Sequence, residues 1–355
     1  MKAMVLARHG GLDALEWHDD VPDPVAGPGE VLIKVLACGL NNTDVNTRTG
    51  WYSKAVTEAT AGEGYEADPD EEDPTWGAAP LTFPRIQGAD VCGRVLGVGE
   101  GVDAGLVGKR VLIDTWLRDW DAPDDLTRVG YFGSEVDGGF AEMTKAPVQN
   151  VHVVESDLTD AELATFATSY ITAENMLTRA KVGAADTVLV PGASGGVGGA
   201  LIQLAKRRGA RVIAMVSEAK QAAVQAYGPD RMLPRSVDSL VKTLKDEKVT
   251  VVADVVGGPM WPQFIDVLER GGRYTCAGAI AGPIVEFDLR WFYLKDLTFT
   301  GATIVPVGMF ADLVTYIERG EVKPILAATY PLSELREAQT AFTEKGHVGN
   351  LVVVP

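Results

Sequence analysis

The fold is decided by one stretch of sequence, Thr187-Val-Leu-Val-Pro-Gly-Ala-Ser-Gly-Gly-Val-Gly-Gly-Ala200, continued by Leu-Ile-Gln-Leu-Ala-Lys-Arg-Arg-Gly-Ala-Arg-Val-Ile-Ala-Met215. A short apolar run ends in a cluster of glycines, and the apolar residues that follow recur at helical spacing. A second apolar run begins after Gly209. This order predicts a strand, a tight turn, a helix and a second strand. Glycines allow backbone N–H groups to approach a diphosphate, and a helix N-terminus favours negative charge, so we expect a dinucleotide seat here.

The chain after this stretch alternates between strand-like and helix-like patterns. Such alternation predicts a parallel sheet with helices on both faces, that is, a Rossmann-type doubly wound domain. We expect strands over 211–216, 231–234, 250–256, 272–279 and 297–303, and helices over 160–180, 218–227, 236–246 and 261–270.

The first 150 residues have a different pattern, with many short strands, glycine-rich turns and little helical spacing. This pattern predicts a small β-barrel-like domain. We expect strands over 2–7, 31–36, 88–99, 109–114 and 137–143, with an irregular segment over 116–136. The tail, with predicted helices over 309–319 and 334–345 and a strand over 350–354, is expected to fold back onto this domain. The predicted division is therefore 1–155 with 304–355 as the catalytic domain, and 156–303 as the cofactor domain.

Composition excludes several classes of protein. The net charge of −17 over 355 residues disfavours nucleic acid, because phosphate recognition needs a basic surface. The apolar runs are too short for a membrane helix and the N-terminus does not resemble a signal peptide, so we expect a cytoplasmic protein. Three widely separated cysteines argue against a disulfide framework. The acidic stretch 54–82 is expected to be a solvated loop, either a lid at the substrate mouth or an insertion without catalytic effect.

Several motifs, taken together, resemble those of the medium-chain dehydrogenase/reductase superfamily and follow its order along nearly the whole chain. The matching pieces are Lys2-Ala-Met-Val5, Gly29-Glu-Val-Leu-Ile-Lys-Val35, Cys38-Gly-Leu-Asn-Asn-Thr-Asp44, Val98-Gly99, Gly138-Gly-Phe-Ala-Glu142, Gly192-Ala-Ser-Gly-Gly-Val-Gly198, Asp254-Val-Val-Gly257 and Gly271-Gly-Arg273. The resemblance implies a GroES-like catalytic domain split by a Rossmann cofactor domain. It also implies a homodimer paired through the last strand of the cofactor domain, near 297–303.

The sequence departs from the zinc-dependent branch of that superfamily. Where that branch has a cysteine ligand and a Gly-His-Glu, this chain has Asn41 and Gly88-Ala89-Asp90, and the region of the structural zinc lobe lacks cysteine. Catalytic zinc needs three protein ligands and structural zinc needs four. We therefore expect no metal, and the zinc-independent branch implies reductases of quinones, enones or enoyl thioesters.

The candidate catalytic residues follow from this resemblance. Asn41 has an amide that can donate to a substrate carbonyl or to the nicotinamide ribose. Tyr52 stands where enoyl reductases of the superfamily place a proton donor, although it can also simply pack at the mouth of the cleft. Asp44 is expected to orient the backbone or the ribose, with direct acid–base chemistry as the alternative.

The cofactor residues are likewise assigned by resemblance. Thr168 is expected near the nicotinamide, Ser194, Gly195, Gly196 and Val197 at the diphosphate, and Val256, Ala277 and Gly278 along the ribose and nicotinamide. Ser217, Lys220 and Arg235 favour the 2′-phosphate of NADPH. Glu218 opposes that choice unless its side chain faces solvent.

The leading hypothesis is an NADPH-dependent oxidoreductase that transfers a hydride to a quinone or an α,β-unsaturated carbonyl without zinc. Two alternatives remain open: a metal-free alcohol or carbonyl dehydrogenase, and a low-turnover NADP-binding protein. The expected partners are a small-molecule substrate and a second copy of the chain.

Overall fold

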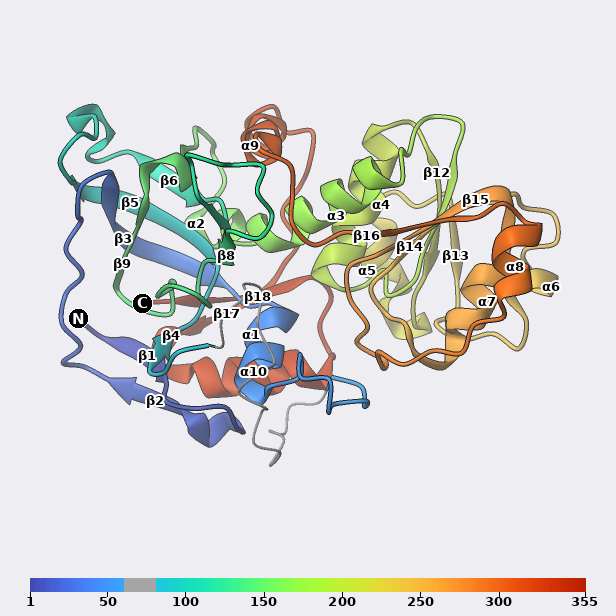
Figure 1. The fold of residues 1–355 in the computed structure, drawn as a ribbon, viewed down its shortest axis with the longest axis horizontal. Helices are drawn as coiled ribbons and strands as arrows, with labels where there is room; N and C mark the ends of the chain where they lie inside the picture. The colour runs from blue at the N-terminus through green and yellow to red at the C-terminus, as the bar shows by residue number, and fades with distance from the viewer. Residues whose placement is uncertain (61–80) are drawn as a thin grey trace. The chain divides into compact units, whose positions relative to one another are not determined.

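The computed structural model describes residues 1–60 and 81–355. The chain divides into two compact units (Figure 1). Unit 1 takes Met1–Val56, the described part of Ala61–Thr168, and Pro306–Pro355; unit 2 takes Thr57–Thr60 and Ser169–Val305. Most of the acidic stretch 54–82, predicted to be a solvated loop, lies outside the described residues. In the part of the chain that the structure describes, no helix has the length and apolar character needed to cross a membrane.

Unit 1 is built on a seven-stranded sheet in the order β10-β6-β5-β3-β18-β17, with β9 also paired to β3. A three-stranded sheet, β2-β1-β4, and a two-stranded ribbon, β7-β8, complete its strands. Its strands are β1 (Ala3–Leu6), β2 (Leu15–His18), β3 (Glu30–Gly39), β4 (Arg85–Ile86), β5 (Asp90–Val98), β6 (Arg110–Ile113), β7 (Trp116–Arg118), β8 (Val129–Tyr131), β9 (Met143–Pro147), β10 (Val151–Val153), β17 (Leu326–Pro331) and β18 (Asn350–Val354). Its helices are α1 (Asn42–Thr49), α2 (Asp160–Leu163), α9 (Met309–Glu318) and α10 (Leu335–Glu344), and the first residues of α3 also lie in it.

Alternation of apolar side chains explains the central strand of unit 1. Val31, Ile33 and Val35 of β3 are fully or almost fully buried, with partly exposed residues between them. Strand β18 pairs antiparallel with β3, so the C-terminal tail is part of this sheet. Helix α10 buries Leu335 in the same core. The GroES-like class predicted for this part of the chain is confirmed.

Unit 2 contains a six-stranded parallel sheet in the order β13-β12-β11-β14-β15-β16. Figure 1 shows α3 and α4 on one side of these strands and α7 on the other, as a doubly wound fold requires. The strands are β11 (Thr187–Val190), β12 (Arg211–Met215), β13 (Arg231–Leu233), β14 (Val249–Asp254), β15 (Leu268–Cys276) and β16 (Thr298–Gly301). The helices are α3 (Ala167–Arg179), α4 (Gly196–Arg207), α5 (Gln221–Gln225), α6 (Leu240–Thr243), α7 (Trp261–Asp266) and α8 (Leu289–Leu294).

Several expected elements differ from those observed. The helix expected over 160–180 is broken into α2 and α3, and the helix expected over 236–246 shrinks to α6. The segment 116–136 contains the β7-β8 ribbon, and α8 and β17 were not predicted from the residue pattern. The strand expected over 137–143 begins only at Met143, because backbone N–H groups at 138–140 donate to carbonyls at 86–88 instead of entering the sheet.

The division between the units also lies further along the chain than the expected limit at 155. Residues up to Thr168 stay with unit 1, because Asn350 donates its side-chain amide to the Thr165 carbonyl at 3.3 Å. The backbone N–H of Thr168 donates to the Asp90 carboxyl at 2.8 Å. Side-chain hydrogen bonds of this kind leave no periodic signal in the sequence.

Candidate active site and cofactor seat

The glycine turn of unit 2 connects β11 to α4. Gly192 has φ +67°, a conformation that favours glycine, and Gly195 is the N-cap of α4. A Cβ added at Gly198 would lie 2.3 Å from the carbonyl oxygen of Gly192, so only glycine lets the helix pack this closely on the turn. At Gly195 the nearest atom would be 3.7 Å away. The turn is therefore tightly packed at Gly198 and open at Gly195.

The open face carries the groups that a diphosphate needs. Gly195 is exposed, and Ser194, Gly196 and Val197 are half-buried. The first backbone N–H groups of a helix have no partner within the helix, and the first turn of α4 contains no acidic residue. These four residues, which are predicted to hold the diphosphate, thus lie together at the N-terminus of α4, a helix of twelve residues. The arrangement fits an anion.

The other predicted cofactor residues of unit 2 lie at the same edge of the sheet. In a parallel sheet the carboxyl ends of all strands meet at one edge, which is where open α/β folds bind ligands. Buried Asp254 shapes this edge by accepting the Val256 N–H at 2.7 Å and the Tyr274 hydroxyl at 2.8 Å. The predicted residues follow successive strands: Ser217 after β12, Arg235 after β13, Val256 after β14, and Ala277 and Gly278 after β15.

The residues after β12 and β13 form a basic pair. Burial and the positive charge of Arg235 lower the pKa of Lys220, so the two cations lie within electrostatic reach of each other. Glu218 is exposed to solvent, and a carboxylate in solvent does not oppose the binding of a phosphate nearby. Two like charges held close together stabilise a bound dianion and repel each other without one.

In unit 1, helix α1 places Asn41 and Asp44 beside the start of β5. Asn41 is the N-cap of α1, and its backbone N–H donates to Oδ2 of Asp44 at 2.7 Å. Burial, with the negative charge of Asp90 adding to it, raises the pKa of Asp44 to about 8. Asp44 is therefore an uncharged acid at neutral pH, with its carboxyl group fixed against the backbone, as the orienting role predicted for it requires.

Asp90 is fully buried at the first position of β5 and is bound to Thr168. Both the backbone N–H and the hydroxyl of Thr168 donate to Oδ1 of Asp90, and the hydroxyl of Tyr131 lies 2.7 Å from the Thr168 hydroxyl. Burial raises the pKa of Asp90 to about 6, while Thr168 and the Asn41 side chain lower it. Oδ2 of Asp90 and the amide nitrogen of Asn41 have no hydrogen-bond partner of standard geometry among the described residues. The Asn41 amide and the Asp90 carboxyl therefore face each other, although no hydrogen bond of standard geometry joins them.

Tyr52 lies beyond the end of α1, with its hydroxyl donating to the Thr43 hydroxyl at 3.4 Å. Burial raises the pKa of this phenol, and the charge of Asp44 adds to the rise. The Trp51 ring packs edge-on against it at 5.7 Å between ring centroids. Tyr52 thus remains a neutral donor at physiological pH.

Asn41, Ala89 and Asp90 occupy the positions at which the zinc-dependent branch of the family was expected to have its zinc ligands. Asn41, Ala89 and Asp90 offer one carboxylate among them, where catalytic zinc needs three ligands. Within residues 1–60 and 81–355, no three His, Cys, Asp or Glu side chains come together in a way that could hold a metal ion.

Sequence reasoning missed Tyr131 and the role of Asp90. Tyr131 lies in the segment expected to be irregular, and Asp90 was considered only as a replaced metal ligand. No periodic pattern identifies either residue. The one available signal was the carboxylate retained next to Ala89, because a carboxylate in an apolar strand needs a buried partner.

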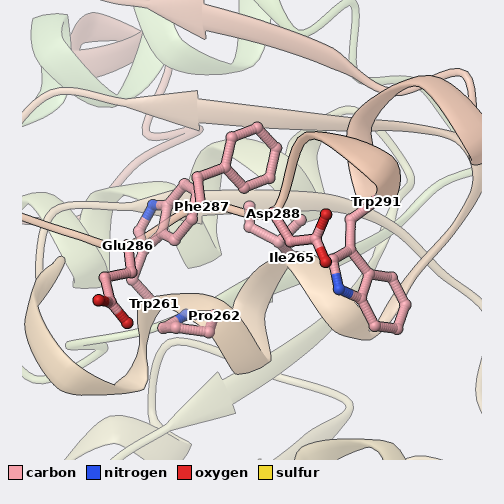
Figure 2. A pocket seen from close by; sticks show the side chains of 7 residues that line it. All are labelled: Trp261, Pro262, Ile265, Glu286, Phe287, Asp288 and Trp291. Atoms are coloured by element: carbon pink, nitrogen blue, oxygen red, sulfur yellow. The ribbon is translucent and has the colours of Figure 1, made fainter.

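The described residues of unit 2 also line a cavity of about 510 Å³ that contains none of the predicted site residues (Figure 2). Trp291 of helix α8 is 41% exposed at this cavity, and Lys295 lies 4.8 Å above its ring. The lining residues are Trp261, Pro262, Ile265, Glu286, Phe287, Asp288 and Trp291. The cavity adjoins α8, whose apolar side chains are exposed, and it is separate from the cofactor residues in sequence and in lining.

Two family models match the chain. Residues 27–156 match the alcohol dehydrogenase GroES-like domain, and residues 196–319 match the zinc-binding dehydrogenase family. A solved structure of a candidate alcohol dehydrogenase from Sinorhizobium meliloti 1021 is 44% identical, covers 100% of this chain and 96% of its own, and has a TM-score of 0.90.

Curated relatives span the whole chain. The acryloyl-coenzyme A reductase of Metallosphaera sedula is 29% identical over 99% of both chains, and the quinone oxidoreductase of Lama guanicoe is 26% identical over 100% of this chain and 97% of its own. A mycobacterial protein solved in complex with NADPH is 27% identical, covers 100% of both chains and has a TM-score of 0.79.

A GroES-like unit and a Rossmann unit with this glycine turn, together with these relatives, define an oxidoreductase. The chain belongs to the medium-chain dehydrogenase/reductase superfamily, as its motifs predicted. One of the proteins similar to it was solved in complex with NADPH.

Proposed function

We propose that this protein is a zinc-independent, NADPH-dependent reductase of an activated alkene or a quinone. The observation that carries the proposal is the replacement of the metal ligands by Asn41, Ala89 and Asp90. Without a Lewis acid, oxidation of a simple alcohol lacks stabilisation of its alkoxide. A conjugated carbonyl needs only polarisation and a proton, which amide, phenol and carboxyl groups supply.

The cofactor supplies a hydride when it is bound. Ser194, Gly195, Gly196 and Val197 are proposed to hold its diphosphate, and Ser217, Lys220 and Arg235 its 2′-phosphate. Val256, Ala277 and Gly278 are proposed along the ribose and nicotinamide, and Thr168 near the nicotinamide. The basic pair after β12 and β13, together with the exposure of Glu218, supports NADPH over NADH.

The substrate-directed groups are proposed to be Asn41, Tyr52 and Asp44. The Asn41 amide nitrogen, which has no standard hydrogen-bond partner among the described residues, polarises the carbonyl oxygen. Tyr52 donates toward the enolate oxygen that develops. Asp44 holds the N-terminus of α1 in place through the Asn41 N–H.

The test compares acceptors and cofactors on one preparation of known metal content. Purified protein, analysed for zinc by mass spectrometry, is assayed with NADPH and NADH against a quinone, an enoyl thioester, an enone and a simple aldehyde. We expect turnover of a conjugated acceptor with NADPH at substoichiometric zinc. Stoichiometric zinc would contradict the proposal. Turnover of the aldehyde alone would favour a metal-free carbonyl dehydrogenase, and NADPH binding without turnover would favour a low-turnover binding protein.

A homodimer is proposed through unit 2. Strand β16 is the edge of the parallel sheet and has one neighbour, β15. An unpaired edge strand is a template for pairing with another chain. Helix α8 precedes it in sequence and exposes large apolar side chains: Leu289 at 67%, Trp291 at 41%, Phe292 at 38%, Tyr293 at 61% and Leu294 at 56%. A contiguous exposed apolar surface of this kind indicates a protein interface.

A further inference from the structure

The contacts of Thr168 link a buried acid to a buried phenol. Thr168 donates its hydroxyl to Oδ1 of Asp90 and its oxygen lies 2.7 Å from the hydroxyl of Tyr131. Asp90 is fully buried, and Tyr131 is 4% exposed. All three residues belong to unit 1. The result is a continuous chain of hydrogen bonds, Asp90–Thr168–Tyr131, with both ends buried and Thr168 half-buried.

The direction of this chain depends on the charge of Asp90. A threonine hydroxyl has one proton, so it can donate to only one neighbour at a time. When Asp90 is a carboxylate, Thr168 donates to it and Tyr131 donates to Thr168. When Asp90 is protonated, it can donate to Thr168, Thr168 then donates to Tyr131, and Tyr131, which also interacts with the Thr115 side chain, donates its own proton onward.

We propose that Asp90 stores the proton consumed in the reduction and passes it through Thr168 to Tyr131. This inference rests on the proposed function. The hydride forms the new C–H bond at the β-carbon, and the Tyr131 proton forms the C–H bond at the α-carbon. The Tyr131 oxygen takes the Thr168 proton, the Thr168 oxygen takes the Asp90 proton, and Asp90 ends as a carboxylate. One proton and one hydride are added, and the cofactor is oxidised by two electrons.

The acid strengths support Asp90 as the store. Burial raises the pKa of Tyr131 well above its ordinary value, and the charge of Asp90 adds to the rise, so a phenolate there is strongly disfavoured. The same holds for Tyr52, whose pKa is raised by burial and by Asp44. Asp90 has a pKa of about 6, so its ionisation costs less free energy than that of Tyr131 or Tyr52. Relay through Thr168 therefore lets a phenol donate without remaining charged.

The titratable groups that face Asp90 are few. They are Asp44 from α1, Cys38 from β3 and Tyr131 from β8, each of which interacts electrostatically with the Asp90 charge. At neutral pH, Asp44 is uncharged with a pKa of about 8, and burial raises the pKa of the Cys38 thiol well above its usual range. Asp90 is thus the one of these four groups that changes charge just below neutral pH.

The first test needs no cofactor and no turnover. Infrared spectroscopy of the free protein follows the carbonyl band of a protonated carboxylic acid as the pH is raised. We expect a component that disappears near pH 6 and is absent in Asp90→Asn. Asp114→Asn is the matched control, because Asp114 is a half-buried carboxyl with a pKa of about 6 that accepts the Trp116 N–H and is not bonded to Thr168. A spectrum of Asp90→Asn identical to wild type would overturn the assignment of the store.

The second test measures the pH profile and solvent isotope effect of the reduction. We expect kcat/KM to fall as pH rises past about 6 in wild type and in Asp114→Asn, and Asp90→Asn to lose this limb. Thr168→Val, which keeps the shape and removes the hydroxyl, should lose about a hundredfold in kcat, as general acid catalysis allows, with Thr168→Ser within about tenfold of wild type. Tyr131→Phe should match Thr168→Val.

The outcomes separate the two proposals. A wild-type enzyme that reduces a conjugated acceptor while Asp90→Asn keeps the wild-type pH profile and isotope effect would overturn the relay and leave the proposed function intact. A wild-type protein without reductase activity would overturn the proposed function and, with it, the role of the chain in reduction. In that case the infrared titration would still show whether Asp90 holds the proton.

Discussion

A Cβ placed on Gly198 would lie 2.3 Å from the carbonyl oxygen of Gly192. The start of α4 and the turn that precedes it are therefore in backbone contact, with no room for a methyl group. Gly195, three residues earlier in the same motif, has open space around it. Gly198 allows the helix to pack closely on the turn, and Gly195 leaves the turn accessible to a ligand.

Gly198→Ala should destabilise unit 2, because the turn must move to admit the methyl group, at a cost of about 1–3 kcal/mol. Urea denaturation and cofactor titration measure the two effects. Gly195→Ala is the control: we expect unchanged stability and weaker NADPH binding, because its Cβ would occupy the open face. Equal stabilities for both variants would contradict this division of roles.

Lys220→Ala and Arg235→Ala should each lower the preference for NADPH, because each removes one cation from the proposed 2′-phosphate site. We expect the ratio of kcat/KM for NADPH and NADH to fall by about tenfold or more, corresponding to a charged hydrogen bond of about 1.5–3 kcal/mol. Steady-state kinetics with both nucleotides gives the ratio. Lys245→Ala, an exposed position between α6 and the start of β14, serves as the control and should leave this ratio unchanged.

Asp44→Asn should change how stability depends on pH. The folded-state pKa of Asp44 is raised to about 8, above its unfolded value, so its neutral form stabilises the fold at low pH. That contribution is complete below about pH 4 and is lost as pH rises through about 8. Urea denaturation at several pH values should show a steeper decline for wild type than for Asp44→Asn. Parallel curves would show that Asp44 is ionised in the folded protein.

Tyr52→Phe should reduce kcat by about tenfold or more if the phenol stabilises the enolate oxygen, since removal of one such donor typically costs this much or more. The substitution keeps the ring and its contact with Trp51, so folding should be preserved. Tyr330→Phe, at a partly buried position packed against the core of unit 1, is the matched control. Unchanged turnover of Tyr52→Phe on the true substrate would leave Tyr52 with a packing role only.

Leu289→Glu with Tyr293→Glu should convert a dimer to a monomer, because charges would replace exposed apolar side chains on α8. Light scattering after size-exclusion chromatography measures the mass. Val25→Glu, at an apolar position of unit 1 that is 79% exposed, is the control and should not change it. A wild-type monomer at micromolar concentration would contradict the proposed homodimer.

The sequence by itself determined the class of fold and the cofactor seat, because both depend on local chemistry. The run from Thr187 to Met215 specifies strand, glycine turn and helix through residue spacing alone, and the retained motifs place the chain in its superfamily. The sequence also predicted the absence of zinc from the residue types Asn41 and Ala89. These features are readable because each is encoded within a few neighbouring residues.

Only the tertiary structure decided which distant side chains share a buried environment. Asp90, Tyr131 and Thr168 come from β5, β8 and the start of α3, and no spacing rule brings them together. Burial raises the pKa values of Asp44 and Asp90, and the charge of Asp90 raises that of Asp44 further, so both values depend on how α1 packs beside β5. The acid–base chemistry of this protein is therefore a property of packing, because desolvation and hydrogen bonding act through space and not along the chain.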